Sequence, residues 1–369
     1  MAHDRLLNEL WATTLARLGG EVAITQLARD TKAFLRPREI KSAVDLLRII
    51  LAYCLGGMGL RSTSAWAASI GLADLSNVAL LGRLRNSTEW MQRLVGALVA
   101  TNCEAAAKGR RIRLLDATTV PRSGVKVRSS GGVWRLHAGF DLPSERFSFF
   151  ELTDETQPEH LERILLVAGE IVIADRGYMG TERLAAVIAA GVDAIVRSGW
   201  RRVSWLDEGG RKLDLIAALL DAEKTGRIDR NIAIARKHGE PMQVRLVAFR
   251  KSPEEAAKSR LKARREASKE TAKMDAGTLV AADWMLLVTT LPRDQFPADD
   301  IAELYRSRWR IEMAFKRLKS IIGLAGPPGQ DVQVAKTWVL AHLLMILLLE
   351  PHISAPEVSP RTAPERLVA

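Results

Sequence analysis

The chain has 369 residues, of which 47% are hydrophobic and 26% charged; this globular composition argues against wholesale disorder or a fibrous repeat. Its 54 Lys and Arg residues exceed its 43 Asp and Glu residues, which gives a formal net charge of +11 at pH 7. The excess favours a polyanionic partner, with nucleic acid ahead of a membrane surface. A basic enzyme without such a partner would have the same charge, so charge alone does not decide.

Several kinds of site and segment are disfavoured by the sequence. The two cysteines, Cys54 and Cys103, have no CxxC spacing, and the six histidines are scattered, so neither a disulfide scaffold nor a zinc site is expected. The longest apolar run, residues 337–349, is too short to cross a bilayer. Charged residues within the first nine positions argue against a signal peptide. We therefore expect no membrane segment and a cytoplasmic location.

Residues 1–105 are predicted to form an all-α domain. Apolar residues recur at helical spacing in 6–18, 43–55 and 90–99, with Pro37 and the Gly56-Gly57 pair as breakers between them. The segment 61–69 is compatible with the start of a helix-turn-helix that binds DNA. It is equally compatible with a packed helical domain that makes no DNA contact.

From residue 111 the pattern changes to short strands rich in apolar and β-branched residues, which open a core segment over 106–197. Strands are predicted at 111–117, 134–142, 147–152, 171–175 and 193–196, and helices at 159–168 and 181–190. Consecutive strands followed by alternating strand and helix predict an α/β fold with a mixed sheet. Asp116 and Asp175 each fall at the end of a predicted strand.

Residues 198–283 interrupt this order and are predicted to be a β-rich insertion. Two alternating runs, 231–236 and 243–250, flank a turn at 238–241 and predict a hairpin. The segment 253–273 predicts a helix rich in both Lys/Arg and Glu, either solvated or facing DNA. A strand at 284–291 returns the chain to the core, which extends to residue 350. The proline-rich residues 351–369 are expected to be a disordered tail.

A helix predicted at 301–322 has an unusual polar face. Five residues share that face on a helical wheel: Tyr305, Arg308, Glu312, Lys316 and Lys319. A salt-bridged surface helix, with Glu312 paired to Arg308 and Lys316, would explain the charges. It would not explain Tyr305 in the same row or the two strand-end aspartates.

Three acids, Asp116, Asp175 and Glu312, together suggest a metal site. Carboxylates about 4 Å apart repel by about 4 kcal/mol at an effective dielectric constant near 20, so a site that gathers them needs a compensating cation. Hard oxygen ligands without histidine or thiolate point to Mg²⁺ or Mn²⁺. Two such ions support phosphoryl transfer at a phosphodiester, and nearby Arg and Lys would hold the DNA phosphates.

The spacing Tyr305-x2-Arg308-x3-Glu312-x6-Lys319 resembles the Tyr-Arg-Glu-Lys signature of the DDE transposases of bacterial insertion sequences, in insertion-sequence family four. Asp116 in LLDATTV and Asp175 in IADRGYMG resemble the first two acids of the family triad, and Glu312 resembles the third. The resemblance extends over residues 111–349. It implies an RNase H-like catalytic core with a β-rich insertion before the helix that bears the glutamate.

The resemblance also implies roles in DNA binding. Trp284, 28 residues before Glu312, would stack on a base flipped out of the transposon end, although a core tryptophan is the alternative. Arg197, 22 residues after Asp175, would contact the end DNA. Phosphates near the flipped base would be bound by Tyr305, Arg308, Lys316 and Lys319.

The function implied is cut-and-paste transposition. The enzyme would nick at terminal inverted repeats, form a hairpin on the transposon end and join the end to target DNA without a covalent enzyme intermediate. The implied partners are double-stranded transposon ends and target DNA, bound by a homodimer at the bacterial nucleoid. Two alternatives remain open: a decayed copy that only binds transposon ends, and a metal-dependent nuclease of the same fold.

Overall fold

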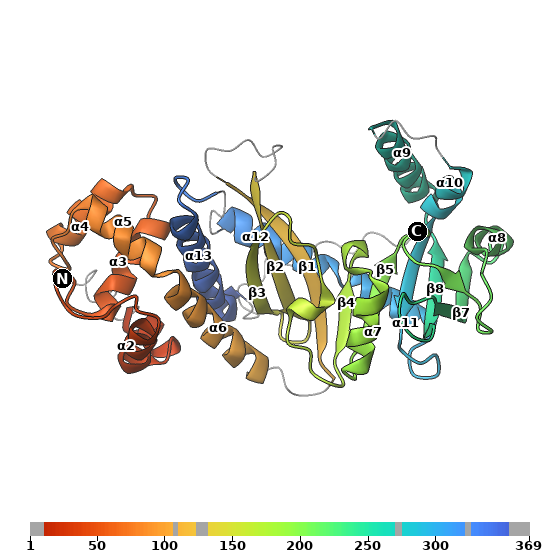
Figure 1. Ribbon diagram of the computed structural model, residues 1–369, viewed down its shortest axis with the longest axis horizontal. Helices are drawn as coiled ribbons and strands as arrows, with labels where there is room; N and C mark the ends of the chain where they lie inside the picture. Colours follow the sequence, from red (N-terminus) through yellow and green to blue (C-terminus); the bar gives the residue numbers. More distant parts are fainter. Residues whose placement is uncertain (1–10, 106–109, 123–131, 270–274, 322–325, 354–369) are drawn as a thin grey trace. The chain divides into compact units, whose positions relative to one another are not determined.

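The computed structural model describes residues 11–105, 110–122, 132–269, 275–321 and 326–353 (Figure 1). The chain forms two compact units. The first comprises Met1–Ala107, Ala117–Gln157 and Met313–Ala369, and the second comprises Lys108–Asp116 and Pro158–Glu312. The expected tail, 351–369, is helical to Ile353 and otherwise lies outside the described residues, as does the side chain of Cys103.

Helices dominate the amino-terminal part of the first unit, as predicted. Their bounds are α2 (Gly20–Asp30), α3 (Ala43–Leu55), α4 (Leu60–Ser69), α5 (Asn77–Asn86) and α6 (Thr88–Ala105). The side chains of Ser42 and Ser76 accept hydrogen bonds from the backbone N–H groups of Asp45 and Ala79, which caps the first turns of α3 and α5. The predicted helix at 43–55 is confirmed at both ends.

The apolar run at 337–349 belongs to a longer helix, α13 (Val332–Ile353). This helix packs against α3, α5, α6 and β3 of the same unit (Figure 1). By length and composition its stretch Val332–Leu349 could cross a membrane, but 72% of that stretch is buried inside the protein. A core helix has the same properties, and the buried Thr337 hydroxyl donates to the Leu84 carbonyl oxygen at 2.9 Å.

Within the described ranges, nine strands form a mixed sheet, so the predicted α/β class is confirmed. The strand order is β3-β2-β1-β4-β5-β9-β8-β7-β6. β1 pairs parallel with β4, and β4 with β5, whereas the β2–β3 pair and the pairs from β5 through β9, β8 and β7 to β6 are antiparallel. The strand bounds are β1 (Ile112–Pro121), β2 (Val133–Asp141), β3 (Arg146–Asp154), β4 (Ile171–Ala174), β5 (Asp193–Ser198), β6 (Trp205–Leu206), β7 (Arg227–Ile234), β8 (Met242–Arg250) and β9 (Trp284–Thr289).

The helix predicted at 159–168 is wrong, whereas the one at 181–190 is confirmed as α7 (Thr181–Ala189). Only a single 3-10 turn, η1 (Leu161–Arg163), forms in the first segment, and Ile164 is already extended. A buried ion pair between Arg113 and Glu170 accounts for the difference. Arg113 also donates to the Leu165 carbonyl oxygen, and Glu170 accepts from the Val167 N–H, so polar contacts hold this segment outside a helix.

Residues 198–283 contain the predicted hairpin, since β7 and β8 pair antiparallel. They also contain α8 (Leu215–Asp221), α9 (Pro253–Lys269) and α10 (Ala276–Ala282), of which only α9 was predicted. Arg245 of β8 is 4% exposed and bonds through Nε to Asp229 of β7 at 2.8 Å, and Arg293 pairs with the same carboxylate at 3.1 Å. β8 in turn pairs with β9 and so joins the hairpin to the sheet.

Candidate active site

The strand register brings predicted site residues to one level of the sheet. Leu115 of β1 pairs with Ala174 of β4, and Ala174 pairs with Val196 of β5. The residues that follow these three positions are Asp116, Asp175 and Arg197. Because both pairings are parallel and neighbouring strands lie about 4.8 Å apart, the three side chains emerge close together on one face. Asp116 is not at the strand end as predicted, because β1 continues to Pro121.

The single helix predicted at 301–322 is wrong: it is broken into α11 (Ala298–Arg306) and α12 (Trp309–Ile321). At the break, the Ser307 hydroxyl donates to the Leu304 carbonyl oxygen at 2.6 Å, and the Arg308 N–H donates to the Tyr305 carbonyl oxygen three residues back. Such side-chain competition and three-residue spacing interrupt the regular α-helical ladder. The break therefore lies between Tyr305 and Glu312 of the predicted polar face.

Arg308 bridges two of the three acids. Its Nη1 donates to Asp116 Oδ2 at 3.2 Å, and its Nη2 donates to Glu312 Oε1. The side chains of Arg308 and Asp116 are 15% and 19% exposed, and that of Glu312 is 53% exposed. Burial alone would lower the pKa of Arg308, but Tyr305 and the three carboxylates outweigh burial and raise it. The guanidinium therefore stays charged and acts as the cation that the clustered acids require.

Asp175 is held by three other groups. The buried Tyr305 hydroxyl donates to Asp175 Oδ1 at 3.0 Å, and Arg197 Nη1 lies 3.6 Å from the same oxygen. Burial would raise the pKa of Asp175, but the Arg176 N–H, the charges of Arg308 and Arg197 and the Tyr305 hydroxyl together lower it. Burial, and then the Asp175 charge, raise the pKa of Tyr305. The carboxylate is therefore ionised and the phenol is neutral.

The donor chemistry of the site suits a hard divalent cation. Asp116, Asp175 and Glu312 offer carboxylate oxygens, the ligands preferred by Mg²⁺ and Mn²⁺. Within the described residues, no three His, Cys, Asp or Glu side chains form a ready metal-ligand group. Instead, the acids share Arg308 as their counter-ion. The residue types thus fit the expected ions. In this structure the carboxylates of Asp116 and Glu312 are paired with the Arg308 guanidinium.

Three further predicted residues are Trp284, Lys316 and Lys319. Trp284 begins β9 and is only 3% exposed. Lys316 and Lys319 follow Glu312 on α12, are exposed and belong to the first unit. Direct contacts thus join Tyr305, Arg308 and Arg197 to the acids within the second unit.

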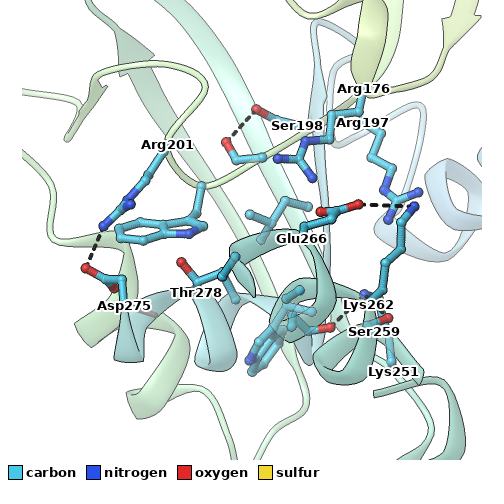
Figure 2. Close-up of a pocket in the computed structure, with 18 residues that line it drawn as sticks. Arg176, Arg197, Ser198, Arg201, Lys251, Ser259, Lys262, Glu266, Asp275 and Thr278 are labelled. Carbon is cyan, nitrogen blue, oxygen red and sulfur yellow. Dashed lines mark hydrogen bonds and ion pairs between the residues drawn. The ribbon is translucent and has the colours of Figure 1, made fainter. Parts of the chain in front are cut away.

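A cavity of about 450 Å³ lies within the second unit, beside Arg197 (Figure 2). Arg197 and Trp284 both line it, so two predicted DNA-binding residues share one space. Sequence reasoning missed Arg176, Trp200 and Lys251 in the same lining. Arg176 directly follows Asp175 in the sequence, and Trp200 lies three residues after Arg197. This closeness to predicted site residues could have identified both, whereas no sequence pattern marks Lys251.

Comparison with known proteins identifies the family. Residues 107–348 match the family model described as "Transposase DDE domain". The chain belongs to the DDE transposase family. This transposase is 38% identical over 361 residues to InsL of Escherichia coli (strain K12), assigned as the transposase for insertion sequence element IS186A. It is also 38% identical over 362 residues to the Escherichia coli transposase for insertion sequence element IS421, and each match covers 96% of both chains.

Family membership confirms the resemblance predicted from the signature. The DDE transposase is thus an insertion-sequence enzyme that acts on DNA. Members of the family generally use divalent metal ions, in agreement with the carboxylate chemistry of the site.

Proposed function

We propose that this DDE transposase catalyses cut-and-paste transposition through Asp116, Asp175 and Glu312. The observation that supports the proposal most is the convergence of acids that are distant in sequence around Arg308. Clustered carboxylates beside a charged arginine suit a reaction in which negative charge develops on phosphate oxygens. The RNase H-like core implied by the family would comprise residues 106–197 and 284–350, with 198–283 as its insertion.

The three carboxylates would hold two divalent ions, Mg²⁺ or Mn²⁺. When bound, such ions activate the attacking oxygen and stabilise the leaving oxygen in an in-line displacement at phosphorus. In this structure the Arg308 guanidinium supplies the positive charge beside Asp116 and Glu312. Its guanidinium can pair with a carboxylate or with a DNA phosphate, because both offer two oxygens in the same planar geometry.

The reaction proceeds by direct displacement. A water oxygen attacks the phosphodiester at the transposon end, the P–O3′ bond breaks, and the 3′-oxygen leaves as a hydroxyl. That hydroxyl then attacks a phosphodiester of the opposite strand, and the 3′-oxygen of the flanking DNA leaves as a hydroxyl, which closes a hairpin on the transposon end. A second water attacks the hairpin phosphodiester, the new P–O3′ bond breaks, and the transposon 3′-hydroxyl is released again. In strand transfer, the freed 3′-hydroxyl attacks a phosphodiester of target DNA and displaces its 3′-oxygen. In each step a water or a DNA hydroxyl is the nucleophile, so no enzyme side chain becomes covalently attached.

Positively charged and aromatic residues would hold the DNA. Tyr305 and Arg308 lie at the acids, so they would contact the phosphates nearest the reacting bond, with Lys316 and Lys319 further along α12. Arg197 and Trp284 would receive the extruded end nucleotide. We further propose that a homodimer pairs two transposon ends, and that the helical segment 1–105 contributes to DNA binding.

A nicking assay tests the proposal. Terminal inverted-repeat DNA from the flanks of the gene is incubated with Mg²⁺ and with Asp116→Ala, Asp175→Ala or Glu312→Ala enzyme. Each variant should lose cleavage while it still binds the ends. Glu303→Ala, which removes an exposed carboxylate of α11, is the matched control and should cleave normally. Full metal-dependent cleavage by any of the three variants would refute the triad, and cleavage without joining to a target plasmid would indicate a nuclease.

A further inference from the structure

The cavity beside Arg197 is lined by two tryptophans that differ in solvent exposure. Trp284 is 3% exposed, so it offers little ring surface to an incoming ligand. Trp200, two residues beyond the end of β5, is partly exposed and lines the same cavity. An aromatic platform for a base must present an open ring face. Of the two indoles, Trp200 meets that requirement better in this structure.

The Trp200 ring contacts an arginine and lies close to a glycine. The Arg201 guanidinium carbon lies 4.5 Å from the centre of the ring, and Arg201 is anchored to Asp275 at 2.5 Å (Figure 2). Asp275 in turn accepts from the Gly277 N–H at the start of α10. A Cβ added at Gly277 would lie 3.2 Å from the Trp200 ring, so the glycine leaves room for it. One face of the indole is therefore covered by a cation.

The charges around the cavity suit an anion. Five cationic side chains line it against two acidic ones: Arg176, Arg197, Arg201, Lys251 and Lys262 against Glu266 and Asp275. Lys251 donates to Ser259 Oγ at 3.0 Å and to the Ala282 carbonyl oxygen at 2.7 Å (Figure 2). Burial, followed by the charge of Arg197, lowers the pKa of Lys251 to about 8. The charged groups that face Lys251 are Arg197, Glu255, Asp283 and Arg176.

We propose that Trp200 is the principal stacking platform for the base of a DNA nucleotide held in this cavity, with Trp284 as a buried wall and Lys251 beside the phosphate. A cavity of about 450 Å³ with aromatic and cationic walls matches a ligand that is both aromatic and anionic. The inference rests on the proposed function, since the nucleotide belongs to the transposon end. It assigns the main stacking contact to a residue outside the Tyr-Arg-Glu-Lys signature.

A double-mutant cycle between protein and DNA tests the inference. Binding of end DNA is measured without divalent metal, so that no strand is cut, for the intact end and for ends with one abasic site at each terminal position in turn. Trp200→Ala should weaken binding of the intact end about 5- to 150-fold, the range expected for the loss of one base stack. With the captured base absent, the same substitution should change binding less than twofold.

Two further variants separate stacking from folding. Trp200→Phe retains a ring and should keep most of the affinity for the intact end. Phe296→Ala removes another arginine-covered ring, because Arg110 lies 5.8 Å from the centre of the Phe296 ring, and it should show no coupling to any abasic position. Equal effects of Trp200→Ala on intact and on all abasic ends would overturn the inference, as would no effect at all.

The two proposals fail separately. Because the cycle needs no metal, its result stands whether or not the enzyme nicks DNA. If the wild-type enzyme nicks DNA but Trp200→Ala shows no coupling to any abasic position, the proposed function stands and the stacking role of Trp200 is refuted. Coupling without nicking by the wild-type enzyme would support the platform and contradict the proposed catalysis.

Discussion

Replacement of Arg308 by Gln tests the electrostatic role of its guanidinium. The substitution removes the charge between Asp116 and Glu312 and leaves three carboxylates without their shared cation. Loss of one partner from a buried ion pair costs about 3–5 kcal/mol, whereas an exposed pair contributes about 0–1 kcal/mol. The Asp116 contact is largely buried and the Glu312 contact is half exposed. We therefore expect the Asp116 contact to dominate, with a loss of about 3 kcal/mol in the free energy of unfolding.

Thermal unfolding in EDTA measures this loss. For domains of about 150–250 residues, 1 kcal/mol corresponds to about 2–4 °C in Tm, so the variant should unfold about 6–12 °C below the wild type. Mg²⁺ should narrow the gap, because it binds the freed carboxylates without having to displace a guanidinium. Arg317→Gln, at an exposed arginine of α12, is the control and should shift Tm little. An Arg308→Gln Tm within 1 °C of the wild type in EDTA would refute this reasoning.

Three other predictions concern stability, pH and the order of steps. Asp229→Asn leaves Arg245 buried without its charged partner and should cost about 3–5 kcal/mol in urea unfolding. Because Arg245 lowers the pKa of Asp229, the wild type should be more stable than Asp229→Asn above about pH 4, and this difference in the free energy of unfolding should shrink in more acidic buffer. A difference that persists in acid would contradict the predicted role of the ionised carboxylate. Lys251 has a pKa of about 8, so end binding should weaken from pH 7 to pH 9 in the wild type but not in Lys251→Arg; parallel profiles would exclude the lysine. Trp284→Ala should slow hairpin closure more than the first nick. Equal slowing of both steps would contradict the proposal that Trp284 helps to receive the end nucleotide.

The sequence predicted the chemistry of the site better than its geometry. The spacing of Tyr305, Arg308 and Glu312 was visible because a helix has a fixed period. The break at Ser307 was not visible, since a serine hydroxyl that bonds to a helix carbonyl has no distinct sequence pattern. Asp116 and Asp175 were predicted from residue type and strand pattern, but their position at one level of the sheet depends on the parallel register of β1 and β4, which is a long-range property.

Errors in the fold have a similar origin. The segment 159–168 has helical periodicity, but it does not form an α-helix. Arg113, which is distant in the chain, and Glu170, which follows the segment, hold it in another conformation through polar contacts. Trp200 was overlooked because its platform consists of contacts to Arg201 and Gly277, and Gly277 is far away in sequence. Local patterns thus predicted most strands and helices, whereas tertiary contacts decided the exceptions.

Location of bound Mn²⁺ by anomalous X-ray scattering would test the central claim most directly. Crystals of the transposase with end DNA and Mn²⁺ should show anomalous peaks coordinated by Asp116, Asp175 and Glu312, with the Arg308 guanidinium moved from the carboxylates towards a DNA phosphate. Manganese bound elsewhere, with Arg308 still bridging Asp116 and Glu312, would contradict the assignment of these acids as the metal-binding triad.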